Sequence, residues 1–283
     1  MKRSILIFAT ILLFQTTSCM EKKKYSIFVD ASTLLEPNKW ERGKLIAQQL
    51  PGMSLMPSLA KLGLYITWYL KINPADEATV QHKVFEFYRN IPVDKKYPII
   101  EYQGEILPPI MAAWLTQDLS TLQIQQKFEE YLNQQSFSDK ERSFYKALVY
   151  GTFDETVTQK TSSLNSNAKE FLKKCLTEYR DNTTCYLIGN LAQRLCPEKE
   201  EPFMKELFEN RICISGETRL VSPSQEFFAH IKQQFPENPE NRIYLISEEP
   251  QQRNGEYFEA ARQFSHHIHR PFSPALKTLL KGQ

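Results

Sequence analysis

Residues 25–35 read Tyr25-Ser-Ile-Phe-Val-Asp-Ala-Ser-Thr-Leu-Leu35. The first five are mostly β-branched and aromatic, which is typical of a buried strand. Asp30 follows this apolar run directly. In open α/β sheets ligands bind beyond the carboxyl ends of the strands, so Asp30 is the first candidate site residue.

Three more apolar runs follow in the last third of the chain and alternate with helical patterns. They span residues 184–188, 211–215 and 242–246. Strands that alternate with helices predict parallel βαβ units, with helices on both faces of one sheet. We therefore expect the residues after these runs to meet Asp30 at one edge of the sheet. These residues are Gly189-Asn190, Ser215-Gly216 and Ser247-Glu248-Glu249.

A long helical region separates the first strand from the later ones. Apolar residues recur at spacings of three and four in segments 40–50, 53–72, 76–91, 105–135 and 138–150. Segment 53–72 is apolar enough to raise the question of a membrane span, but Pro57, Lys61 and Lys71 favour a buried helix. We predict an α/β core formed by residues 25–36 and 164–283, with a mainly α-helical insertion at 37–163.

One helix start is predicted in more detail. In Ser222-Pro223-Ser224-Gln225, Ser222 would be the N-cap, Pro223 the first helical residue and Gln225 the partner in a capping box.

Residues 1–19 have the pattern of a secretory signal. Lys2 and Arg3 precede an apolar run over 5–14 and a short polar segment that ends at Cys19. Ser18-Cys19 resembles the end of a bacterial lipoprotein signal, which makes Cys19 a candidate for lipidation, although Thr16 stands where such signals usually have Leu. We predict an exported protein, either periplasmic or anchored to the membrane by this lipid. A start at Met20 would instead give a cytoplasmic protein.

The charge balance of the chain limits the classes of partner that we expect. Without Lys2 and Arg3 the 35 basic residues fall to 33, equal to the 33 acidic ones. A neutral body gives no electrostatic reason to expect nucleic acid or an anionic membrane surface as a partner.

In an oxidising compartment four cysteines could form two disulfides by any of three pairings, but buried free thiols are our preferred interpretation. These cysteines are Cys175, Cys185, Cys196 and Cys213.

The four strand ends, in this order, resemble the four motifs of the haloacid dehalogenase (HAD) superfamily. Residues 25–35 match the first motif, an apolar strand that ends in Asp-x-Asp-x-Thr/Val. Tyr186-Leu-Ile-Gly-Asn190 is similar to the second, which ends in Ser/Thr and often Asn. Ser215-Gly-Glu-Thr-Arg-Leu-Val-Ser-Pro223 resembles the Ser-Gly-Glu segment that leads to Lys-Pro. Ile243-Tyr-Leu-Ile-Ser-Glu-Glu-Pro250 resembles the last motif, which carries Asp-Asp.

The resemblance covers residues 25–36 and roughly 165–265. It implies a Rossmann-like parallel sheet, with the helical middle in the place of the family's inserted cap. It also implies that Asp30 is the nucleophile. The family's second Asp, a general acid, is Ser32 here, and losing a general acid typically costs about 10²–10⁴ in rate. Members that act on acyl phosphates or carbon–halogen bonds lack this Asp too.

The binding groups of the family are also replaced. Gly189 stands in place of the second motif's hydroxyl, next to Asn190, and Ser222 in place of the third motif's Lys. The missing Lys matters most, because a phosphate dianion would meet several carboxylates with only a metal to offset them. Two like charges 4 Å apart repel by about 4 kcal/mol at an effective dielectric constant near 20. Arg219 and Lys232 are the candidates to replace this cation.

A metal site would use Asp30, Glu248 and Glu249, whose oxygens suit Mg²⁺. Ser247 also resembles the metal-free dehalogenases, but these carry an Asp where this chain has Gln252.

Structural roles compete with these assignments. Asp30 could cap the next turn and Asn190 the following helix. Ser222 is accounted for as a helix cap, and Glu248 and Glu249 fit solvated loop acids. The alternation of His266, His267 and His269 fits a surface strand better than a metal cluster.

These observations lead to a capped HAD-like protein that is catalytically impaired, and that binds a small molecule or another envelope protein in the crevice between core and cap. The alternative is a Mg²⁺-dependent phosphohydrolase. In it Asp30 attacks, Glu248 and the Ser32 carbonyl hold the metal, and Arg219 replaces the missing Lys. A third hypothesis, a purely helical interaction module, predicts no parallel sheet.

Overall fold

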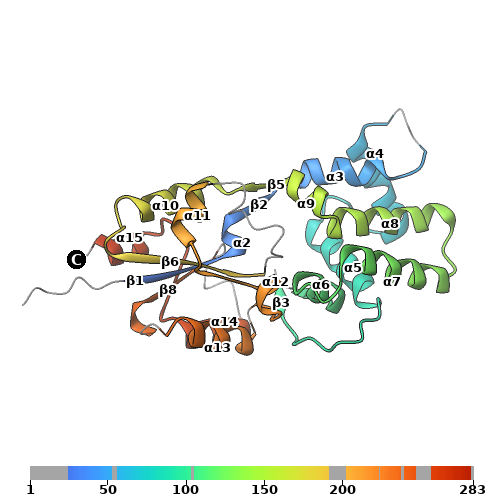
Figure 1. The fold of residues 1–283 in the computed structure, drawn as a ribbon. Helices are drawn as coiled ribbons and strands as arrows, with labels where there is room; N and C mark the ends of the chain where they lie inside the picture. The colour runs from blue at the N-terminus through green and yellow to red at the C-terminus, as the bar shows by residue number, and fades with distance from the viewer. Residues whose placement is uncertain are drawn as a thin grey trace, which may run out of the picture.

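The computed structural model describes residues 25–52, 56–102, 105–190, 202–222, 224–236, 239–246 and 256–281. It contains a sheet-based core and a helical cap, joined side by side (Figure 1). The core sheet has five strands in the order β7-β6-β1-β8-β9, and every neighbouring pair is parallel. The strands are β1 (Tyr25–Asp30), β6 (Thr183–Gly189), β7 (Ile212–Ile214), β8 (Arg242–Leu245) and β9 (His267–His269).

Helices cover both faces of the sheet (Figure 1). The alternation of side chains along β1 decides which residues meet which helices, since successive side chains of a strand point to opposite faces. Ile27 and Val29 pack in one apolar cluster and Phe28 in another. The first cluster includes residues of α10 (Ser166–Leu176), α11 (Pro202–Phe208) and α15 (Pro274–Lys281). The second includes residues of α13 (Gln225–Gln234) and α14 (Glu256–Phe264).

The cap has an apolar core of its own, rich in aromatic residues such as Tyr88, Phe128 and Phe144. The cap also contains a short hairpin of β3 (Glu101–Tyr102) and β4 (Glu105–Ile106). Its helices are α3 (Lys39–Gln48), α4 (Ser58–Tyr65), the π-helix η1 (Ile66–Leu70), α5 (Glu77–Arg89), α6 (Pro109–Leu115), α7 (Thr121–Gln134), α8 (Asp139–Phe153) and α9 (Glu155–Thr161).

Five short elements complete the described structure, and two of them carry the chain between core and cap. Strand β2 (Leu35–Pro37) pairs antiparallel with β5 (Ser162–Leu164), so the outgoing and returning segments form one ribbon. The others are α2 (Ala31–Leu34), α12 (Ser215–Thr218) and η4 (Pro239–Asn241).

The predicted fold class, a parallel α/β core with an inserted helical cap, is confirmed, and the parallel sheet rules out the purely helical module. The apolar segment around residues 58–70 forms α4 and η1 and contributes Tyr65, Ile66 and Leu70 to the cap core. In the described ranges, no helix is both long and apolar enough to cross a membrane. Of the late histidines, His267 and His269 lie in β9, which pairs with β8 at the edge of the sheet, and His266 precedes the strand.

Three local predictions were wrong. The strand expected over 211–215 ends at Ile214, and Ser215 begins α12. The helix expected from Ser222 begins at Gln225, and Ser224 is its N-cap, with its hydroxyl oxygen accepting from Phe227 N at 3.1 Å. The single helical pattern over 105–135 is interrupted, because Ser120 starts a new helix with a complete capping box.

Helices α3 and α8 pack closely at Gly151. A Cβ added there would lie 2.3 Å from Ile46 Cγ1. We expect Gly151→Ala to lower the free energy of unfolding by about 1–3 kcal/mol through overpacking. Gly63→Ala in α4 is the matched control, because its nearest heavy atom, Pro74 Cγ, would lie 3.7 Å away. The control should keep or raise stability by up to about 1 kcal/mol through helix propensity. Equal melting temperatures for the two variants would contradict the close contact.

Candidate functional site

Asp30 is buried at the carboxyl end of the central strand, with 6% of its surface exposed. One of its carboxyl oxygens, Oδ1, accepts a hydrogen bond from Ser32 N at 2.9 Å, so Asp30 is the N-cap of α2. The other, Oδ2, accepts from the hydroxyl of Tyr244 at 2.5 Å. The competing prediction that Asp30 caps the following turn therefore describes its local contact correctly.

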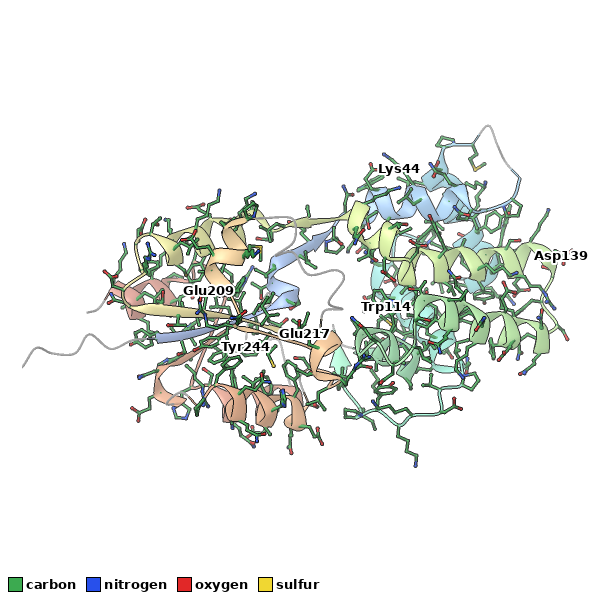
Figure 2. All side chains as sticks on the ribbon, in the orientation of Figure 1. Lys44, Trp114, Asp139, Glu209, Glu217 and Tyr244 are labelled. Carbon is green, nitrogen blue, oxygen red and sulfur yellow. The ribbon has the colours of Figure 1, made fainter. Side chains whose placement is uncertain are left out.

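Tyr244 is a site residue that the sequence analysis missed. It lies opposite Phe28 in the pairing of β1 with β8, and residues 28 and 30 share one face of the strand. Its ring packs inside the core against Phe228 and Phe264 (Figure 2). From this position the phenol reaches along the strand to the Asp30 carboxyl group. Only the register of the two strands places the residues together, since 214 positions separate them.

Gly189 ends β6 beside Asp30 in a conformation that L side chains rarely adopt, with φ of +114°. A Cβ built on it would lie 3.1 Å from Ala31 N and 3.2 Å from both Cγ and Oδ1 of Asp30. This is the position that the resemblance assigns to a hydroxyl-bearing residue. A serine or threonine here would require the carboxyl group or its backbone to move.

Asn190 and Ser222 join two of the strand-end loops. The side-chain amide of Asn190 donates from Nδ2 to Ser222 O and accepts at Oδ1 from Ser222 N at 2.8 Å. Both polar ends of the amide thus bind backbone, and Ser222 itself is only 1% exposed. The backbone N–H and C=O of Ser222 are both bound to Asn190, and Ser224, two residues later, is the N-cap of α13. The hydroxyl of Thr33 similarly donates to Leu245 O at 3.2 Å and ties α2 to β8.

The two candidate replacements for the missing cation bind elsewhere. Arg219 Nη1 donates to Thr116 O in the cap at 2.6 Å. Lys232 Nζ donates to Gln263 O at 3.0 Å. Within the described part of the chain, no cationic side chain forms an ion pair with Asp30. The proposed role of Arg219 as a substitute for the lysine is therefore not supported by its contacts.

Several predicted site residues lie outside the described residues, namely Cys19, Ser247, Glu248 and Glu249. Among the residues that are described, no group of three or more His, Cys, Asp or Glu side chains could hold a metal ion. Asp30 and Ser32 are described, but the carboxylates that would complete a Mg²⁺ site with them are not. The described residues alone do not fit a Mg²⁺ centre.

Three of the four predicted core cysteines are described, and all three are buried free thiols. Cys175 lies beside Cys185 in the cluster between sheet and α10, and the hydrogen bond that its thiol donates to Cys185, together with burial, raises the pKa of Cys175. Burial likewise raises the pKa of Cys213 to about 12. The prediction of buried free thiols is confirmed for these three residues, and Cys196 lies outside the described ranges.

No protein-family model and no curated protein matches the sequence. Several solved structures match the fold. A HAD family enzyme from Bacteroides thetaiotaomicron is 12% identical, with 92% of this chain and 98% of that chain covered and a TM-score of 0.49. A predicted HAD-like hydrolase from Porphyromonas gingivalis is 12% identical, with 92% and 99% covered and a TM-score of 0.47. The L-2-haloacid dehalogenase from Xanthobacter autotrophicus is 10% identical, with 92% and 84% covered and a TM-score of 0.41.

These likenesses concern the fold alone. The Bacteroides enzyme was also solved in complex with magnesium and inorganic phosphate, which is a property of that protein. In this chain the parallel sheet and the helical insertion after β1 have the arrangement that the four motifs predicted. The expected fold class, a parallel α/β core with an inserted helical cap, is therefore confirmed.

The contact between Tyr244 and Asp30 can be measured by a double-mutant cycle. We expect Tyr244→Phe to lower the free energy of unfolding by about 1.5–3 kcal/mol, because a buried carboxyl oxygen loses a hydrogen-bond donor. In an Asp30→Ala background the same change should cost much less, which gives a coupling energy of about 0.5–3 kcal/mol. Urea unfolding of the four proteins measures it. Additive effects would show that the two side chains do not interact.

Proposed function

We propose that this HAD-like protein is catalytically impaired, and that it binds a small molecule or another envelope protein in the crevice between core and cap. One observation carries the proposal. Around Asp30, the positions that resemble substrate-binding groups are occupied by residues that hold the strand-end loops together instead.

The contacts of Asp30 make it a poor nucleophile. A carboxylate attacks well when an oxygen faces the reacting atom and is poorly stabilised in the ground state. Here one oxygen of Asp30 accepts from the Ser32 backbone and the other from the Tyr244 hydroxyl. Hydrogen bonds donated to a carboxylate stabilise its charged form. Both contacts therefore oppose attack by Asp30.

The described residues around Asp30 also provide little to bind a substrate anion. Gly189 supplies no hydroxyl, and a side chain in its place would require Asp30 or the backbone at Ala31 to move. Ser222 supplies no cation, and Arg219 is bound to the cap. A phosphate group that approached Asp30 would meet a buried carboxyl group without compensation from the described cations, at a repulsion of about 4 kcal/mol for charges 4 Å apart. Ser32 adds no general acid.

The site retains a rigid framework of hydrogen bonds. The strand ends are tied to one another through Asn190 and Ser222, and through Thr33 and Leu245. A rigid edge of this kind favours binding, because little conformational entropy is lost when a partner docks. A site that keeps its structural framework but lacks the catalytic groups is what we expect of a binding protein built on an enzyme fold.

Location and partners follow from the sequence. Residues 1–19 are proposed to direct export, with Cys19 as the point of lipid attachment and as the membrane contact. The partner would then be a small molecule of the envelope or an envelope protein, and not nucleic acid. The Mg²⁺-dependent phosphohydrolase is the competing function, and the experiments below separate the two.

An activity assay tests the proposal. Purified protein is incubated with Mg²⁺ and either acetyl phosphate or p-nitrophenyl phosphate, one substrate with a leaving group that needs no proton and one general phosphatase substrate. We expect the rate to equal that of the matched Asp30→Asn variant. Turnover by the wild type that Asp30→Asn abolishes, while both proteins unfold cooperatively at similar temperatures, would reject catalytic impairment.

A binding measurement supplies a readout that does not need turnover. A ligand that binds only the folded state stabilises it by about 2.7 kcal/mol at 100 times its Kd. Inorganic phosphate at millimolar concentration, with and without Mg²⁺, should leave the melting temperature unchanged, because the described site has no cation for it. A rise in the wild type that is absent in Asp30→Asn would show that an anion site survives.

A further inference from the structure

Within the described ranges, the cap contacts the core at two separate places. The first is the ribbon of β2 and β5, where Asn165 N donates to Leu34 O at 2.7 Å and Asn38 N donates to Thr161 O. The second is the segment over residues 215–221, which follows β7, begins with α12 and contacts α6. Figure 1 shows the ribbon on the upper side of the junction and α12 on the lower side, next to α6. In Figure 2, Glu217 marks the core side of this second contact and Trp114 the cap side.

The backbone of α6 shows why the second contact forms. The last carbonyls of a helix have no partner inside the helix and must find one elsewhere. The cap satisfies three of them itself, since Ala112 O, Ala113 O and Trp114 O accept from backbone N–H groups of residues 116, 119 and 117. The next two accept from core side chains. Leu115 O accepts from Ser215 Oγ at 3.2 Å, and Thr116 O accepts from Arg219 Nη1 at 2.6 Å.

The charge of Arg219 suits its position at the C-terminal end of α6. A guanidinium near a helix C-terminus is stabilised by the partial negative charge of the exposed carbonyls. Arg219 has a left-handed backbone conformation with φ of 60° at the end of α12, where its N–H donates to Ser215 O. Non-glycine residues rarely adopt this conformation. The turn brings both donors, Ser215 and Arg219, to the same helix end.

Apolar packing and a bracing carboxylate complete the contact. Val221 of the core is buried in one cluster with Ile100, Leu107 and Ala112 of the cap. On the cap side, Asp118 Oδ2 accepts from three donors at 2.6 to 2.7 Å and so holds the end of α6 in place. The donors are Lys95 Nζ, Tyr97 OH and Thr116 Oγ1.

We propose that residues 215–221 form a latch that holds the cap against the core. The segment that resembles the family's cation-bearing motif then serves as a docking element, with Arg219 as its main contact. With the ribbon alone the cap could swing about one edge, whereas the latch fixes the opposite side. This inference does not depend on the proposed function, because the latch would hold the cap in an active or an inactive protein.

Hydrogen–deuterium exchange of the full chain tests the latch. We expect Arg219→Ala to speed amide exchange about tenfold in peptides covering 107–119, because these amides then open with the cap. Arg211→Ala is the matched control. Arg211 also donates to backbone carbonyls, Cys185 O and Leu207 O, but these lie within the core. Its substitution should leave exchange over 107–119 unchanged.

A second measurement follows the shape of the molecule. Arg219→Ala should increase the radius of gyration in solution scattering, and Arg219→Lys, which can still donate to Thr116 O, should restore part of the wild-type value. If Arg219→Ala does not fold, Ser215→Ala is measured in the same way. Exchange over 107–119 that stays at the wild-type rate, or that rises equally in Arg211→Ala, would overturn the latch.

Discussion

The structure depends on the pairing of β1 with two strands that are far away in the sequence. Residues 25–30 form hydrogen bonds with residues 183–188 on one side and 242–245 on the other. This insertion makes β1 the centre of the sheet and buries all six of its residues. It also brings the two ends of the intervening region together at the ribbon of β2 and β5, so that region forms a separate unit beside the core. Asp30, Gly189 and Tyr244 become neighbours for the same reason.

The polar groups at this edge of the sheet are used internally. Both ends of the Asn190 amide form hydrogen bonds with the backbone of Ser222, and Thr33 donates to the end of β8. Asp30 accepts hydrogen bonds from the backbone of its own turn and from Tyr244. Buried polar groups are costly when left without partners, and such mutual satisfaction makes the edge stable and rigid. The same groups would have to be released before they could bind a reacting anion. Stability of the loops and catalytic readiness therefore compete at this site.

The sequence predicted what depends on local pattern and on the order of elements. Apolar runs located the strands, and their alternation with helices was sufficient for a parallel sheet with a helical insertion. The sequence did not predict contacts that depend on strand register, such as the hydrogen bond from Tyr244 to Asp30. The sequence also placed the start of α13 at Ser222, because Ser222 and Ser224 are both suitable N-cap residues and the local pattern does not distinguish them. The direction of Arg219 depends on a left-handed turn and on unsatisfied carbonyls of α6, neither of which is visible in a motif.

The position of β1 also bears on the order in which the chain reaches its native state. The cap helices make contacts among residues that are close in sequence, and local contacts form quickly. The first strand, by contrast, finds its second neighbour only when residues 242–245 are available, more than 200 positions later. During synthesis Ile27, Phe28 and Val29 would therefore remain without their final partners until almost the whole protein has been made. The core is completed last, although its central strand is made early.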